Sequence, residues 1–257
     1  MRILAVGDLV GTAGLKKFEQ EYQKIKEKEN IDFCIVNAEN VADGMGITEK
    51  AYRSLVNQKV DCITMGNHTW AKKDIFGFID NPNIVRPANY SKNNPGRGYQ
   101  VFECKGKKIA VINLIGRVTM TVLSENPFIV ADEIIEKIKN DVDIIIVDFH
   151  AEATAEKIAL GYHLDGRITA LYGTHTHVPT ADETILENGT AYITDIGMTG
   201  PKKSVIGMSI EASTKRFLTS LPERYKTAEG EAKLNACIFE INEEDCRVKT
   251  IKRICIE

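Results

Sequence analysis

Five short segments along the chain carry the carboxylate, amide and imidazole side chains that proteins use to bind metal ions. They are Gly7-Asp8, Asn37-Ala38-Glu39-Asn40, Gly66-Asn67-His68, Phe149-His150 and Gly173-Thr174-His175-Thr176-His177. Four of the five histidines in the chain lie in these segments, and each segment follows a short apolar run typical of a buried strand. Carboxyl ends of parallel strands lie along one edge of a sheet, where ligands bind. We therefore expect the five segments to meet at one site.

The residue types in these segments suit a centre with two metal ions. Two divalent cations about 3.5–4 Å apart need a ligand that bridges them, and a carboxylate can do so through its two oxygens. Asp8 and Glu39 are the candidates for this bridge. Asn67 offers a neutral carbonyl oxygen, and imidazoles fill further positions as neutral ligands. If His175 and His177 lie in extended backbone, their side chains project to the same face, which suits one histidine for each metal.

Each of these residues also has a structural interpretation when it is considered alone. Asp8 could cap a helix, Asn67 could occupy a turn, and a His-x-His pair is more often a surface or core feature than a metal site. The metal-site interpretation rests on their combination at the ends of successive strands. We assign Glu152 and His163 structural roles, and expect His163 on the surface of a helix.

Composition excludes several other classes of protein. The chain of 257 residues has a net charge of −3 and a sequence pI near 6.0, so it lacks the basic field that binds a nucleic-acid duplex. No apolar run approaches the ~20 residues that span a membrane, and we expect no secretory leader, because the first residues read directly as a strand. The six cysteines show no CxxC spacing, which favours a reduced, cytoplasmic protein. Assembly into a homo-oligomer stays open.

Hydrophobic periodicity predicts alternating strands and helices. Central strands are expected at Ile3–Val6, Phe33–Val36, Cys62–Met65, Asp143–Phe149 and Ile168–Tyr172. Helices are expected at Leu15–Glu29, after the N-cap residue Thr48, from about Lys72 to Ile79, and at Asp132–Lys139. Hairpins are expected from Tyr99–Glu103 to Lys108–Leu114 and from Glu183–Leu186 to Ala191–Thr194, with a last antiparallel strand at Arg247–Ile256. The pattern indicates a single α/β domain over residues 1–257, with two packed sheets and helices outside.

In this order, the motifs resemble those of the calcineurin-like metallophosphoesterases. In detail they resemble one bacterial branch, the YmdB-like family of phosphodiesterases. The matching segments are residues 7–11, 37–40, 66–70, 173–182 and 195–200, so the likeness runs from the first strand to about Gly207. It implies a metallophosphoesterase-like β-sandwich of two mixed sheets flanked by helices.

Two positions depart from the wider superfamily. Its usual Gly-Asp-x-His motif supplies a histidine ligand where this chain has Val10, which cannot bind a metal, and its usual bridging aspartate is here Glu39. The resemblance implies that Asn40 replaces the missing histidine, although a neutral amide is a weaker ligand than imidazole. It places one metal on Asp8, Glu39, Asn40 and His177. It places the other on Glu39, Asn67, His150 and His175.

A site with two divalent ions and two carboxylates stays net positive and attracts a phosphate ester. A water shared by the metals loses a proton near neutral pH, and the resulting hydroxide attacks phosphorus in line. The leaving alkoxide needs a proton, and His68, which would face the substrate and not the metals, is the expected general acid.

If the resemblance holds, the substrate is a cyclic nucleotide, in particular a 2′,3′-cyclic monophosphate. The resemblance implies iron, with manganese as an active substitute, whereas the ligand types themselves leave zinc and magnesium open. Two other functions stay open: a phosphomonoesterase or nucleotidase, and a signalling protein that binds a nucleotide and turns over slowly. Arg86, Asn89 and Tyr90 could touch a base or phosphate, but a surface loop fixed by Pro87 is the favoured interpretation of that segment.

Overall fold

The computed structural model describes residues 1–224 and 226–257, which form two sheets packed face to face. The first sheet has the order β2 (Asp8–Leu9), β12 (Met198–Pro201), β13 (Ala232–Ile241), β1 (Arg2–Val6), β3 (Phe33–Asn37), β4 (Cys62–Thr64) and β5 (Ile84–Val85), and β14 (Val248–Ile256) pairs with β13. The second sheet has the order β10 (Thr184–Ile185), β11 (Ala191–Ile193), β9 (Ala170–Thr174), β8 (Ile144–His150), β7 (Lys107–Ile115) and β6 (Tyr99–Cys104).

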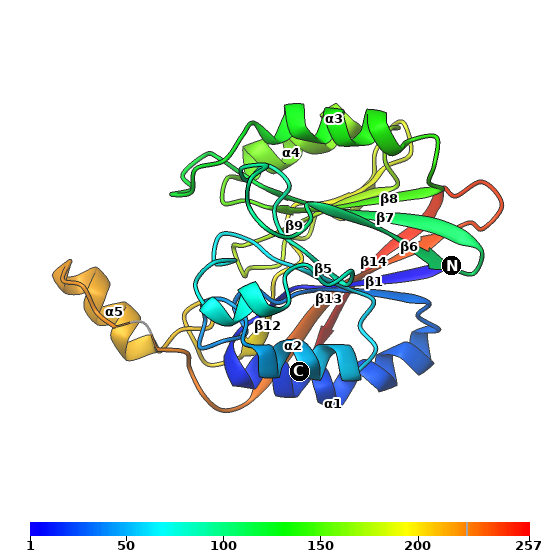
Figure 1. The fold of residues 1–257 in the computed structure, drawn as a ribbon. Coiled ribbons are helices and arrows are strands. Elements are labelled where there is room, and N and C mark those ends of the chain that lie inside the picture. Colours follow the sequence, from blue (N-terminus) through cyan, green and yellow to red (C-terminus); the bar gives the residue numbers. More distant parts are fainter. Residues whose placement is uncertain (225) are drawn as a thin grey trace.

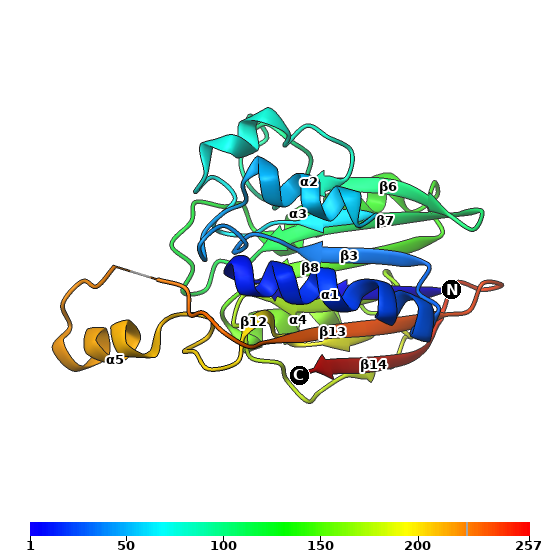
Figure 2. The same ribbon diagram turned by 90° about the horizontal axis from the view of Figure 1, so that it is seen from below.

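Helices cover the outer face of each sheet, which gives four layers (Figure 1). The helices α1 (Gly11–Glu29) and α2 (Glu49–Asn57) pack on the first sheet, and α3 (Pro127–Ile138) and α4 (Thr154–Leu164) pack on the second. A short 3-10 helix, η1 (Lys73–Gly77), follows β4. The last helix, α5 (Ile210–Thr219), extends away from the sandwich in both views (Figures 1 and 2).

The apolar strands are buried on both faces, as their continuous hydrophobic runs require. In β1, Leu4 and Val6 face the helices, whereas Ile3 and Ala5 face the core between the sheets. The strands β1, β3 and β4 are mutually parallel, and so are β7, β8 and β9. Their carboxyl ends therefore deliver loops to one edge of the sandwich.

The expected sandwich of two mixed sheets flanked by helices is confirmed. Both expected hairpins form, and the last strand is antiparallel to β13. Thr48 caps α2 by accepting a hydrogen bond from the backbone N–H of Ala51. Within the described part of the chain, none of the helices combines the length and apolar character needed to cross a bilayer.

One expectation about the elements was wrong, and one strand was missed. The helix predicted from Lys72 to Ile79 is only the 3-10 helix η1, which ends close to the turn-forming Asn81-Pro82. The sequence pattern predicts no strand at residues 232–241, yet β13 lies at the centre of the first sheet between β1 and β12. A strand that arrives from the far end of the chain and inserts beside β1 is decided by long-range pairing, which local pattern does not reveal.

A buried ion pair joins α4 to the segment after β11. Lys157 Nζ lies 2.7 Å from Asp195 Oδ2, and the two side chains are 0% and 1% exposed. Both charged groups are buried, so removal of one partner leaves the charge of the other buried and uncompensated.

We therefore predict that Lys157→Met lowers the free energy of unfolding by about 3–5 kcal/mol. As a matched control, Lys139→Met removes the cation from the exposed Lys139–Glu136 pair and should cost less than about 1 kcal/mol. Urea unfolding at pH 7 measures both. Similar losses for the two variants would show that the Lys157–Asp195 pair is no more important than a surface ion pair.

Candidate metal centre

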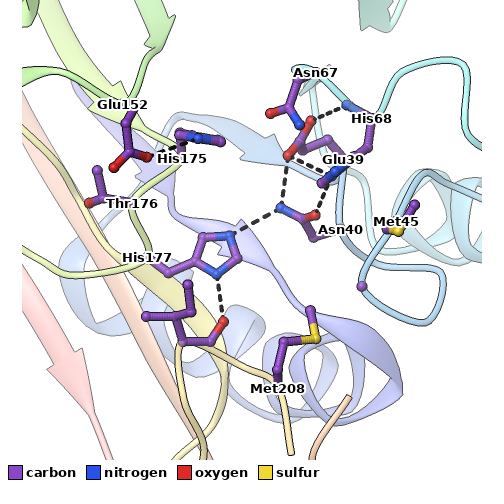
Figure 3. Close-up of a pocket in the computed structure, with 12 residues that line it drawn as sticks. Glu39, Asn40, Met45, Asn67, His68, Glu152, His175, Thr176, His177 and Met208 are labelled. Carbon is purple, nitrogen blue, oxygen red and sulfur yellow. Dashed lines mark hydrogen bonds and ion pairs between the residues drawn. The ribbon is translucent and has the colours of Figure 1, made fainter. Parts of the chain in front are cut away.

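All five segments singled out in the sequence meet at the edge where the parallel strands of both sheets end. Asp8 follows β1, and Glu39 and Asn40 follow β3, while Asn67 and His68 follow β4. From the second sheet, His150 ends β8, and His175 and His177 follow β9. Figure 3 shows how the side chains of Glu39, Asn40, Asn67, His68, His175 and His177 gather around one pocket.

Glu39 lies at the centre of this cluster and is fully buried. Its Oε2 accepts a hydrogen bond from the backbone N–H of His68 at 2.8 Å. Its Oε1 accepts from Asn40 Nδ2 at 2.9 Å and lies 3.1 Å from His150 Nε2. One carboxylate thus touches segments that follow β3, β4 and β8.

The imidazole of His150 is held from behind by a hydrogen-bond chain. Thr174 donates its hydroxyl proton to the buried Asp148 at 2.7 Å, so its oxygen is free to accept from His150 Nδ1 at 2.9 Å. This fixes the proton of a neutral His150 on Nδ1 and leaves the lone pair of Nε2 directed into the cluster. Burial raises the pKa of Asp148 to about 6.

The other two histidines follow the same arrangement. His175 Nε2 pairs with Glu152 at 3.1 Å, and its Nδ1 lies 3.0 Å from His150 Nε2. His177 Nδ1 donates to the carbonyl oxygen of Ile206 at 2.8 Å. In each of the three rings one nitrogen is engaged by an acceptor outside the cluster, and the other points inward.

The backbone between His175 and His177 is not extended, so the condition for both side chains to project from one strand face is not met. Both residues have positive φ, 98° for His175 and 65° for His177. Asp195 stabilises this turn, because its Oδ2 accepts hydrogen bonds from the backbone N–H and the hydroxyl of Thr176 at 3.1 and 2.8 Å. The two imidazoles therefore reach different parts of the cluster through a turn and not through strand alternation.

Burial and neighbouring charges together set the pKa values in the cluster. Desolvation raises the pKa of Asp8. Burial opposes ionisation of Glu39, but His150 and His68 outweigh it and hold the Glu39 pKa well below its ordinary value. Burial likewise lowers the pKa of His150, yet Glu39 and Asp8 together raise it to about 9. Burial and the neighbouring His150 lower the pKa of His175 to about 3.

The donor set fits a cation better than it fits protons. His150 Nε2 lies within 3.1 Å of three acceptors, Glu39 Oε1, Asn67 Oδ1 and His175 Nδ1, yet one N–H cannot serve all three. Ligand atoms of Glu39, His150 and His175 all lie within 4.8 Å of one another. In the described part of the chain, the buried Asp8 Oδ1 has no hydrogen-bond partner, and such an atom indicates a missing ion or water.

The amide of Asn40 and the imidazole of His68 connect this cluster to the pocket. Asn40 directs its Nδ2 at His177 Nε2, 3.1 Å away, and its Oδ1 at His68 Nδ1, 2.9 Å away. A metal on the His177 side would need the Asn40 amide turned over, so that the oxygen faces it. His68 is 31% exposed on the pocket wall.

The structure changes the interpretation of one residue and supports that of several others. Glu152, assigned a structural role, lines the pocket and pairs with His175; its position two residues after His150, just past a strand end, was the available signal. His163 is a surface residue of α4, as expected, and pairs with Asp132. The guanidinium of Arg86 donates hydrogen bonds to the carbonyl oxygens of Pro95, Pro87 and Asn94.

The neighbouring loop residues are also engaged within the protein. Asn89 donates to the carbonyl oxygens of Ile115 and Glu125, and the hydroxyl of Tyr90 donates to the carbonyl oxygen of Gly66. These contacts support the structural interpretation of the loop. Through Gly66, however, Tyr90 fixes the turn that carries Asn67.

Comparisons with known proteins agree on one family. A model of the family described as YmdB-like protein matches residues 4–254. The chain is 49% identical over 257 residues to the Bacillus subtilis (strain 168) protein named 2′,3′-cyclic-nucleotide 2′-phosphodiesterase, with 100% of this chain and 97% of that protein covered. A crystal structure of a hypothetical protein from Thermus thermophilus has a TM-score of 0.94 and 37% identity, covering 100% of this chain and 99% of that chain. A crystal structure described as a novel phosphatase from Mycoplasma pneumoniae has a TM-score of 0.94 and 40% identity, covering 100% and 93%.

The central position of Glu39 yields a prediction about metal content. Glu39→Gln replaces a carboxylate with an amide that has one acceptor oxygen, so we expect the purified variant to lose most of its metal. Inductively coupled plasma mass spectrometry measures the metal-to-protein ratio. Glu136→Gln, on the exposed face of α3, is the control and should retain the wild-type ratio. Retention of two metals by Glu39→Gln would show that Glu39 is not a bridging ligand.

Proposed function

The chain belongs to the YmdB-like protein family, and from this membership and its site we propose that it is a metal-dependent phosphoric diester hydrolase. The observation that carries the proposal is the inward convergence of His150, His175 and His177. Their outer nitrogens are engaged by Thr174, Glu152 and the Ile206 carbonyl. That is the usual arrangement of metal-binding histidines, whose second nitrogen is fixed by an acceptor.

Within this proposal two metal ions occupy the cluster. We assign to one of them the ligands Asp8, Glu39, Asn40 and His177. We assign to the other the ligands Glu39, Asn67, His150 and His175. The 3.1 Å separation of Glu39 Oε1 from His150 Nε2 and the approach of His177 Nε2 to Asp8 Oδ1 at 3.9 Å support this division. We expect iron, with manganese as an active substitute, from membership of the YmdB-like family, because imidazole and carboxylate ligands by themselves suit zinc as well.

We propose a 2′,3′-cyclic nucleotide as the substrate. The Bacillus subtilis relative, 49% identical over the whole chain, is named for that reaction. A five-membered cyclic diester is strained, and opening the ring relieves the strain, so its barrier is lower than that of a six-membered or linear diester. When bound, the metal ions would supply positive charge to the phosphate oxygens and lower the pKa of a water molecule.

The protein's own contribution to leaving-group departure falls to His68. Its Nδ1 lies 3.3 Å from Glu39 Oε1 and faces the side-chain amide of Asn40. The Glu39 carboxylate engages Nδ1 and orients the ring, so the proton that His68 delivers is the one on Nε2. We propose that it goes to the departing ribose oxygen.

The substitution His68→Ala tests whether His68 acts as a general acid or as a metal ligand. His68→Ala should keep both metals and lose roughly 10²–10⁴-fold in turnover of a cyclic nucleotide. The loss should shrink for bis-p-nitrophenyl phosphate, because nitrophenolate leaves without a proton. His163→Ala, which removes the exposed histidine of α4, should behave as wild type. Loss of metal from His68→Ala would instead make His68 a ligand.

Substrate preference distinguishes this proposal from a phosphatase. We expect 2′,3′-cyclic nucleotides to be hydrolysed faster than 3′,5′-cyclic ones, with a nucleoside monophosphate as the stable product. Steady-state rates on both isomers, with a parallel assay for inorganic phosphate, provide the measurement. Equal rates, or rapid release of inorganic phosphate, would favour a phosphomonoesterase. The single-domain organisation, cytoplasmic location and homo-oligomer remain predictions.

A further inference from the structure

The pocket above the metal centre has a side that the proposed chemistry does not use. Its volume is about 360 Å³. Polar residues of the cluster line one part, whereas Met45, Ile206 and Met208 line another. In Figure 3, Met208 lies below Asn40 and His177, with Met45 to their right. We call Met45, Ile206 and Met208 the apolar wall.

Short loops attach the apolar wall to the metal centre. Met45 lies in a turn in which the N–H of Gly44 donates to the carbonyl oxygen of Asn40 at 3.1 Å. The carbonyl oxygen of Ile206 accepts a hydrogen bond from His177 Nδ1. Met208 packs on the bare backbone of Gly44, where an added Cβ would lie 2.6 Å from its terminal methyl carbon. The wall is therefore held at a fixed place relative to Asn40 and His177.

Ile206 occupies this wall at a conformational cost. Its φ is 45°, a left-handed conformation that β-branched residues rarely adopt. Ser204 Oγ holds the turn by accepting from the N–H of Gly207 at 2.9 Å, and the Gly207 carbonyl accepts from Ala228 at 2.9 Å. The side chain is 49% exposed, so it does not serve the core. Strain of this kind is common at functional sites.

The wall matches the part of the substrate that the metals do not bind. With the phosphate at the metal centre, a nucleotide still presents a ribose and a flat aromatic base. Methionine side chains pack well against aromatic rings through the polarisable sulfur. Met45, Ile206 and Met208 carry no side-chain hydrogen-bond donor that could distinguish one base from another.

We propose that Met45, Ile206 and Met208 form the nucleobase subsite, an apolar wall that accepts purines and pyrimidines alike. This inference rests on the proposed function, and adds to it the residues that bind the base. It places the phosphate at the metal centre and the base on the side of Asn40 and His177.

Two substrates test the wall: 2′,3′-cyclic AMP, and ethylene phosphate, a five-membered cyclic diester without ribose or base. The double variant Met45→Ser/Met208→Ser should raise KM for the nucleotide by about 10- to 100-fold, since two sulfur–aromatic contacts are lost. Its kcat/KM for ethylene phosphate should stay within about twofold of wild type. Leu123→Ser, an exposed apolar residue outside the pocket, is the control. An unchanged nucleotide KM, or equal losses on both substrates, would overturn the subsite.

Ile206→Asn separates binding from folding. Asparagine tolerates left-handed backbone better than isoleucine, so the variant should unfold at the same or a higher temperature while its nucleotide KM rises. A lower unfolding temperature with unchanged KM would overturn the role of Ile206.

Calorimetry keeps the inference testable if the proposed activity fails. A wild-type protein that hydrolyses neither diester would refute the proposed function. If the apolar wall binds the base, adenosine 3′-monophosphate should still bind more weakly to Met45→Ser/Met208→Ser than to wild type. Binding of inorganic phosphate should be unchanged. Equal affinities for the adenosine monophosphate would overturn the subsite independently of turnover.

Discussion

The structure is organised around two carboxylates that are fully buried where the two sheets meet. Asp8 and Glu39 lie at the ends of neighbouring parallel strands, with no exposed surface. A buried carboxylate is costly unless a cation or several hydrogen-bond donors compensate it. Glu39 has four such contacts, whereas Asp8 Oδ1 has no hydrogen-bond partner within the described residues and only the imidazoles of His150 and His177 near it, at 3.8 and 3.9 Å. The neighbouring histidines and the proposed metal ions would both compensate these buried negative charges.

Much of the surrounding fold positions the groups that face these carboxylates. The second sheet contributes its histidines from β8 and β9, and a buried polar layer beneath them fixes their orientation. Asp148 and Thr174 hold His150 from behind, and Asp195 holds the turn between His175 and His177. Because Asp195 also pairs with the buried Lys157, its carboxylate connects α4 to the turn between His175 and His177.

The pocket combines two environments that suit the two ends of a nucleotide. Its proposed metal centre is polar and buried, and its apolar wall is partly exposed and attached to the same loops. Attachment through Asn40 and His177 fixes the distance between the phosphate position and the wall. In this proposal, ring strain at the phosphate favours 2′,3′-cyclic nucleotides over other diesters. The apolar wall binds the base without distinguishing one nucleobase from another.

The sequence by itself determined the candidate ligand residues, most of the strands that carry them and the two-sheet architecture. Apolar runs that end in Asp8, Glu39 or His150 report both burial and position, because strand ends in parallel sheets share one edge. Only the tertiary structure decided what depends on contacts between distant segments. The central place of β13, the turn that carries His175, and the pairing of that residue with Glu152 all follow from such contacts. Local pattern encodes burial and periodicity, whereas the orientation of a side chain is set by neighbours that the chain brings together only when it folds.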